Sequence, residues 1–171
     1  MNIKYENKGN KETVKLNEPL ISIDNLEVKF INQDATIHAV NGVNIKLDKG
    51  KVLTILGESG SGKSVTMRSI LRLLPPKASL SGSIIVDGKN IIDMSQDQLS
   101  NMRGREVSMI FQEPMVAFDP VYKVGAQIAE TVVRHLGTSF NEGLARAKEL
   151  FDLVQIPSAK SRLSAYPHEL S

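Results

Sequence analysis

The sequence predicts an α/β fold in which a buried strand leads into a glycine-rich loop and then into an amphipathic helix. The apolar run Val52–Leu56 is rich in β-branched residues, which is typical of a strand buried on both faces of a parallel sheet. The loop Gly57–Ser64 follows directly, and apolar residues at helical spacing come next. After Pro120 the apolar spacing becomes helical throughout. We therefore expect a β-rich front half and a helical second part.

Alternating apolar residues predict further strands before the loop, over Leu20–Phe30, Thr36–Val40 and Val43–Leu47. The first of these is interrupted near Asp24 and Asn25, where the alternation fails. The other two are separated by Asn41-Gly42, a dipeptide typical of turns. A turn over Asp48–Gly50 then leads into the apolar run.

Behind the loop, the spacing predicts a helix over Val65–Leu74 that Pro75 and Pro76 stop. Two more strands are expected, at Ser83–Val86, closed by Asp87-Gly88, and at Val107–Phe111. Ser95 and Gln98 have the spacing of a capping box, so a short helix is expected to begin there.

Two amphipathic helices are expected in the last part of the chain. The first carries apolar residues four apart and ends at Gly137; its apolar face is Val124, Ile128, Val132 and Leu136. The second begins at the capping-box pair Ser139 and Glu142 and ends before Pro157; its apolar face is Leu144, Ala147, Phe151 and Val154.

Composition excludes several classes of function. The chain has 171 residues, a net charge of +2 and no cysteine. Such a small charge does not predict nucleic-acid binding, and the lack of cysteine rules out disulfides and thiolate sites. No apolar run approaches the roughly 20 residues of a membrane span. Residues 1–18 are polar and predict a solvated tail.

The most informative motif is Gly57-Glu58-Ser59-Gly60-Ser61-Gly62-Lys63-Ser64, which matches the phosphate-binding pattern G-x-x-x-x-G-K-[ST] in full. Glycines allow the backbone to wrap an anion, and the following helix adds free N–H groups and a positive dipole end. Lys63 brings a charge to the β- and γ-phosphates, and Ser64 places a hydroxyl on Mg²⁺. The motif predicts a nucleoside triphosphate site, but kinases, GTPases and other ATPases share it.

Three segments together resemble the ATP-binding subunits of ABC transporters, in particular the oligopeptide and dipeptide import branch. They are the loop GESGSGKS, the stretch MIFQEPM at Met109–Met115 and the closing AYPHELS at Ala165–Ser171. The resemblance implies a P-loop NTPase core with an antiparallel β subdomain and a partial α-helical subdomain, truncated inside the family's signature motif. The corresponding boundaries are a tail over 1–18, a nucleotide-binding core over 19–112 and a helical part over 113–171.

The resemblance implies roles for particular residues. ATP, with Mg²⁺, would contact the loop residues Gly57, Glu58, Ser59, Gly60, Ser61, Gly62, Lys63, Ser64 and Val65. Phe30 matches the family's adenine-stacking aromatic residue, and Gln112 matches the glutamine that approaches Mg²⁺ and the attacking water. Lys63 and Gln112 would be catalytic, Ser64 and Gln112 would be metal ligands, and Ser171 would match the signature serine.

The implied partners are a second ATP-binding subunit packed head to tail, two transmembrane permease subunits and, indirectly, an extracellular solute-binding protein. The implied location is the cytoplasmic face of the membrane. The family's Walker B aspartate, catalytic glutamate and late histidine are expected beyond Ser171. Apolar strands such as Val52–Leu56 would then have uncovered faces. A non-hydrolysing nucleotide-binding fragment and a soluble ABC-type ATPase without a membrane partner stay open as alternatives.

Overall fold

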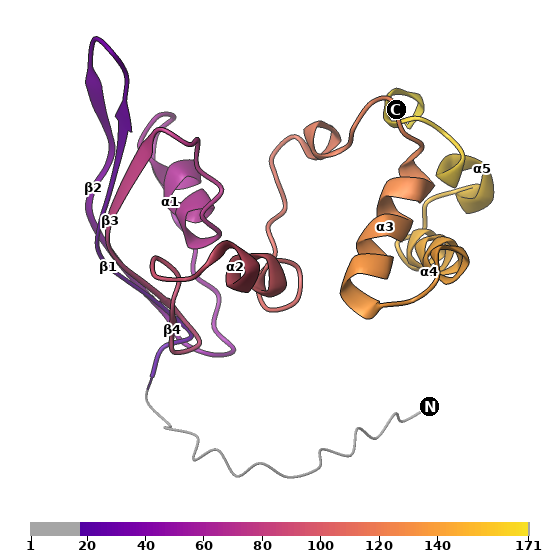
Figure 1. Cartoon of the computed structure of the whole chain (residues 1–171), viewed down its shortest axis with the longest axis horizontal. Helices are drawn as coiled ribbons and strands as arrows, with labels where there is room; N and C mark the ends of the chain where they lie inside the picture. Colours follow the sequence, from indigo (N-terminus) through magenta and orange to yellow (C-terminus); the bar gives the residue numbers. More distant parts are fainter. Residues whose placement is uncertain (1–17, 171) are drawn as a thin grey trace. The chain divides into compact units, whose positions relative to one another are not determined.

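The computed structural model describes residues 18–170, and the chain divides after Ser100 into two compact units. The first unit contains a β-sheet with helices, and the second contains helices only among its described residues (Figure 1). The expectations for the tail up to residue 17 and for Ser171 lie outside the described residues.

The first unit is built on an antiparallel sheet with strand order β2-β1-β3-β4. Its strands are β1 (Ile21–Ile31), β2 (Thr36–Leu47), β3 (Ala78–Val86) and β4 (Lys89–Asn90). The central strand β1 pairs with β2 on one side and with β3 on the other. Asp87 and Gly88 both have positive φ angles, 44° and 79°, which suits the tight turn between β3 and β4. The predicted antiparallel sheet is confirmed.

Two irregularities bend this sheet. Asn25 has a φ of 47° at a shift in the register of β1 with both neighbouring strands, so the predicted interruption of the first strand is confirmed. The prediction of a turn at Asn41-Gly42 is wrong, because β2 continues through it. The ladder shifts there instead, since Leu26 pairs with Val43 and Val28 pairs with Val40. Gly42, with a φ of 69°, accommodates the extra residue as a β-bulge.

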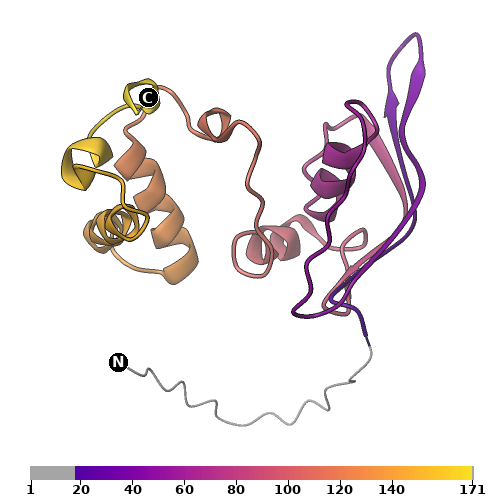
Figure 2. The ribbon, with the colours of Figure 1, turned by 180° about the vertical axis from the view of Figure 1, so that it is seen from behind.

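The helix behind the loop is α1 (Lys63–Ile70), which packs against β1 and β2. Figures 1 and 2 show it on one face of the sheet from opposite sides. It ends before Leu74, contrary to the prediction, because a Schellman motif stops it. The Arg72 N–H donates to Ser69 C=O, and the Leu73 N–H donates to Arg68 C=O. Arg72 takes the left-handed φ of 48° that this motif requires.

The core of the first unit lies between the sheet and its helices. Its side chains come from the strands, from the end of α1, from the segment behind β4 and from α2 (Gln96–Met102). The buried apolar residues are Ile23, Leu26, Val28, Val40, Ile70, Leu71, Ile84, Val86, Ile91 and Leu99. The predicted capping box at α2 is confirmed, with Ser95 and Gln98 each accepting from the other's N–H.

Two apolar runs predicted as strands, Val52–Leu56 and Val107–Phe111, do not form strands in the structure. Neither run pairs in a ladder with another strand among residues 18–170; Val107 makes only an isolated bridge with Arg103. A strand exists only through hydrogen bonds to a neighbour, so an apolar run without one stays irregular. Val52, Leu56 and Ile110 are accordingly 94%, 88% and 95% exposed.

The second unit is a small helical assembly. Its elements are η1 (Pro114–Ala117), α3 (Val124–Leu136), α4 (Phe140–Leu153), α5 (Ala159–Leu163) and η2 (Pro167–Glu169). Both predicted helices are confirmed, and α3 is capped by Gly137 with a φ of 69°. Leu136 and Val154 of the predicted apolar faces are 66% and 64% exposed, and Val154 lies just beyond α4. The helices α3 and α4 approach closely at Gly143, where an added Cβ would lie 2.8 Å from the Ala129 carbonyl oxygen.

The capping box at the start of α4 gives this unit a pH-sensitive contact. The Glu142 carboxylate accepts hydrogen bonds from the Ser139 hydroxyl at 2.7 Å and from the Ser139 N–H at 2.8 Å. The bond from the hydroxyl has the larger effect, and together the two bonds hold the pKa of the Glu142 carboxyl below its usual range. The charged form is therefore stabilised in the folded chain only.

We expect the stability of the chain to fall as pH decreases below the ordinary glutamate pKa of about 4.3, because the unfolded chain then binds more protons than the folded one. The contribution of Glu142 is fully present above that value and is lost as pH falls through its lowered pKa. Urea unfolding of the parent and of Ser139→Ala at several pH values should show a weaker pH dependence in the variant. Ser164→Ala, at an exposed hydroxyl of the second unit that donates to the Lys160 carbonyl, is the control. Equal pH dependence in all three proteins would contradict the assignment.

Candidate functional site

The loop Gly57–Gly62 begins with a tight turn. The Ser61 N–H donates to the Glu58 carbonyl at 3.3 Å, so Gly60 occupies the third position of the turn, with a φ of 82°. A type II turn needs a positive φ at that position, which glycine adopts without steric cost. The turn folds the loop back toward the start of α1.

Gly62 holds the loop against the sheet. Its φ is 87°, and an ideal Cβ on it would lie 2.5 Å from the carbonyl oxygen of Ala39 in β2. No L side chain fits in that space without a shift of backbone. The loop therefore reaches its position only because residue 62 lacks a side chain.

The start of α1 has the properties of an anion site. Gly62 is the N-cap residue and provides no side-chain cap, and the first turn of this helix contains no acidic residue. The first N–H groups of a helix have no intrahelical partner and carry the positive end of the helix dipole. An anion such as a phosphate is the partner that these groups bind best.

Lys63 brings its ammonium group back over the loop. Its Nζ donates to the carbonyl of Gly57 at 2.7 Å, to the carbonyl of Glu58 at 2.5 Å and to Ser61 Oγ at 3.1 Å. The lysine is half-buried, whereas the loop residues around it are exposed. A full positive charge is thus held against the glycine loop, next to the start of α1.

The other predicted loop residues lie in the same unit. Glu58, Ser59 and Ser64 are exposed, and Val65 is half-buried. The Thr66 N–H and hydroxyl both donate to the Gly62 carbonyl, at 2.9 and 3.0 Å, and so attach the first turn of α1 to the loop. The residues predicted to contact ATP, Gly57 to Val65, therefore form one continuous and largely exposed segment.

Phe30 lies at the end of β1, where it pairs with Ile37 of β2 and Ala78 of β3. It is half-buried. Ile37 lies two residues before Ala39, the residue next to which Gly62 packs. Phe30 and the loop therefore lie near the same end of the sheet. Its stacking on adenine stays a prediction.

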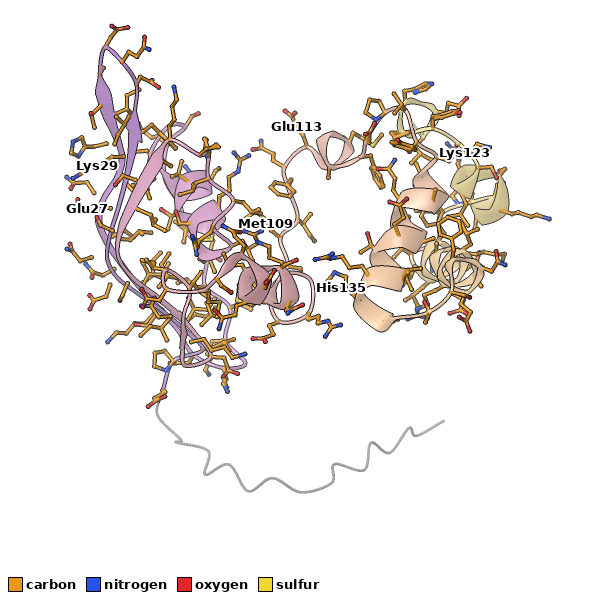
Figure 3. The ribbon with its side chains drawn as sticks, viewed as in Figure 1. Glu27, Lys29, Met109, Glu113, Lys123 and His135 are labelled. Carbon is orange, nitrogen blue, oxygen red and sulfur yellow. The ribbon has the colours of Figure 1, made fainter. Side chains whose placement is uncertain are left out.

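Gln112 belongs to the second unit and is exposed. It lies in the irregular segment between Met109 and Glu113, both labelled in Figure 3. The segment continues into η1 at Pro114. The roles of Gln112 in catalysis and metal binding stay predictions, and the prediction for Ser171 falls outside the described residues.

The chemistry of the loop fits Mg²⁺ delivered with a polyphosphate. Among the residues that the structure describes, no group of three or more His, Cys, Asp or Glu side chains could hold a metal ion. Mg²⁺ in nucleotide sites usually takes one or two protein oxygens and the phosphate oxygens of the substrate. The exposed hydroxyl of Ser64 at the start of α1 suits that arrangement.

Two contacts at the site were not predicted from the sequence. One is the approach of Gly62 to Ala39, which no motif could indicate because the two residues belong to separate elements. The other is the hydrogen bond between Ser61 and Lys63. Ser61 occupies a variable position of the phosphate-binding pattern, so only its nearness to the lysine in sequence could have suggested the contact.

These features define a P-loop protein with the ABC ATPase fold over part of its length, including the antiparallel sheet and the helices. The sequence profile described as "ABC transporter" matches residues 40–171. The chain belongs to this family.

Curated relatives indicate which branch of the family the chain resembles. The chain is 42% identical over 154 residues to the oligopeptide transport ATP-binding protein OppD of Bacillus subtilis, covering 89% of this chain and 43% of the relative. It is 43% identical over 154 residues to the probable peptide ABC transporter ATP-binding protein y4tR of Sinorhizobium fredii, covering 89% of this chain and 46% of the relative. The chain thus spans somewhat less than half the length of these curated relatives, and the resemblance to the peptide-import branch is confirmed.

A solved structure supports the fold. The dimeric ATP-binding cassette MJ0796, in a post-hydrolysis state bound to ADP and Pi, matches with a TM-score of 0.72 and 22% identity. The match covers 88% of this chain and 63% of that one. At this identity the likeness establishes the shared fold of the two proteins.

Gly62→Ala should weaken binding of inorganic pyrophosphate by about five- to a hundredfold, because overpacking typically costs about 1–3 kcal/mol. The added Cβ meets backbone of β2, so the loop itself must shift. Isothermal titration calorimetry measures the affinity. The matched control is Gly60→Ala, which has the same left-handed strain, with a φ of 82°, but no atom within 4 Å of the new Cβ. Equal losses in the two variants would mean that backbone strain alone, and not the contact with Ala39, places the loop.

Proposed function

We propose that this chain binds Mg-ATP through the loop Gly57–Ser64 and forms the nucleotide-binding part of an ABC importer for peptides. The observation that carries the proposal is the position of the Lys63 ammonium, held over the loop beside the uncapped start of α1. A charged donor and a set of free N–H groups converge there, which is the arrangement that polyphosphates require.

Different residues would contact different parts of Mg-ATP. Backbone N–H groups from Gly57 to Val65 would wrap the phosphates, and Lys63 would neutralise charge on the β- and γ-phosphates. Ser64 and Gln112 would hold Mg²⁺, which links the phosphate oxygens and neutralises their charge. Phe30 would stack on the adenine, and Gln112 would orient the attacking water and couple the site to the membrane partner.

The names of the relatives support peptide import. The Bacillus subtilis relative is described as an oligopeptide transport protein, and a Brucella abortus relative, 44% identical over 161 residues, as a putative peptide import protein. By this analogy the whole protein would hydrolyse ATP to drive peptide uptake. A soluble ABC-type ATPase without a membrane partner is the less favoured alternative, since these relatives are named for transport.

The proposed assembly follows the same analogy. A second ATP-binding subunit would pack head to tail against this one, as the dimeric state of MJ0796 suggests. Two transmembrane permease subunits and, indirectly, a solute-binding protein would complete the importer, with this chain peripheral on the cytoplasmic face. Within residues 18–170, none of the helices has the length and apolar character needed to cross a membrane.

We expect Lys63→Ala to weaken Mg-ATP binding by about ten- to a hundredfold, because hydrogen bonds to charged groups contribute about 1.5–3 kcal/mol. Isothermal titration calorimetry of the purified chain with Mg-ATP measures this loss of affinity. The matched control is Lys148→Ala, at an exposed lysine of the second unit that pairs with Asp152 at 2.7 Å. Affinity that is equal in the parent and Lys63→Ala, or absent from the parent, would contradict the proposed function.

A further inference from the structure

We propose that the Ser61 hydroxyl is a displaceable partner of Lys63, which occupies one donor of the ammonium until a phosphate oxygen replaces it. The inference rests on the proposed function of the loop and assigns it a residue that tunes affinity. Ser61 would thus be a positioning residue that acts through Lys63.

The first step is a count of hydrogen bonds. A lysine ammonium has three donors and no acceptor. In this structure Lys63 Nζ has three acceptors within the loop, namely the Gly57 carbonyl, the Glu58 carbonyl and Ser61 Oγ. All of its donors are therefore used by the loop itself, and a phosphate oxygen must replace one of these acceptors in order to receive a linear hydrogen bond.

The second step identifies the acceptor that leaves. The two carbonyls belong to the loop backbone and lie 2.7 and 2.5 Å from Nζ, whereas Ser61 Oγ lies at 3.1 Å. The Glu58 carbonyl also accepts from the Ser61 N–H, so moving a carbonyl away from Nζ would shift the loop backbone. Releasing Ser61 requires only a rotation about χ1 of an exposed side chain. The hydroxyl is the acceptor that exchanges with least rearrangement.

The third step concerns the space that the hydroxyl occupies. An ideal Cβ on Gly57 would lie 2.9 Å from Ser61 Oγ and 3.7 Å from Lys63 Nζ. The lack of a side chain at residue 57 therefore leaves room for the hydroxyl to sit between the first glycine of the loop and the lysine.

A competing hydrogen bond lowers affinity for the ligand that must displace it. Since a net hydrogen bond contributes about 0.5–1.5 kcal/mol, equivalent to roughly two- to tenfold in affinity, Ser61→Ala should bind pyrophosphate about two- to tenfold more tightly than the parent. If the hydroxyl instead served mainly as a donor to phosphate, its removal would weaken binding. The sign of the change therefore distinguishes the two roles.

The first arm of the test uses no anion. The rate at which an amine-acylating reagent modifies Lys63 is followed by peptide mass spectrometry, with Lys148 as the internal reference. Loss of one acceptor should raise the Lys63 rate about two- to tenfold in Ser61→Ala. Ser61→Thr keeps a hydroxyl and should stay close to the parent rate. Equal rates in Ser61→Ala and the parent would overturn the proposal.

The second arm measures pyrophosphate affinity of the same three proteins by calorimetry. Tighter binding by Ser61→Ala, with Ser61→Thr near the parent, supports the proposal, and weaker or unchanged binding by Ser61→Ala overturns it. Failure of the parent to bind pyrophosphate would count against the proposed function. The labelling arm distinguishes this failure from one of the Ser61 contact, because it needs no ligand.

Discussion

The contact between Gly62 and the Ala39 carbonyl is the constraint on which the rest of the site depends. It fixes where the loop meets the sheet and hence where α1 begins, since Gly62 is the N-cap of that helix. The orientation of α1 in turn sets where its unpaired N–H groups point. Lys63, the first residue of the helix, can reach back over the loop only from this starting point.

Electrostatics at the loop follow from this geometry. The positive end of α1 and the Lys63 ammonium lie together, and no carboxylate in the first turn of the helix opposes them. The loop meanwhile satisfies the ammonium with its own oxygens, two of them from backbone. An ammonium held in this way is already positioned, so binding of phosphate requires exchange of a hydrogen bond and not a search by a free side chain.

Local signals in the sequence were sufficient for much of the fold. The capping boxes at Ser95 and Ser139, the helix end at Gly137 and the irregularity near Asn25 involve neighbours in the chain, and all were predicted. The buried strand at Val52–Leu56 was predicted with equal reason but did not form. Its pattern reports only that the run suits a sheet interior, and pairing depends on a neighbouring strand that no local pattern supplies.

The sequence by itself predicted the chemistry that we propose for the loop Gly57–Ser64, because the motif specifies glycine, lysine and serine at fixed spacing and each has a physical role in holding a polyphosphate. It also identified the family, through segments far apart in the chain. Only the tertiary structure decided that Gly62 packs on Ala39, that β2 continues through Asn41-Gly42, and that Ser61 shares the Lys63 ammonium with two carbonyls. These features depend on distances between backbone atoms, and a linear pattern of side-chain types does not encode such distances.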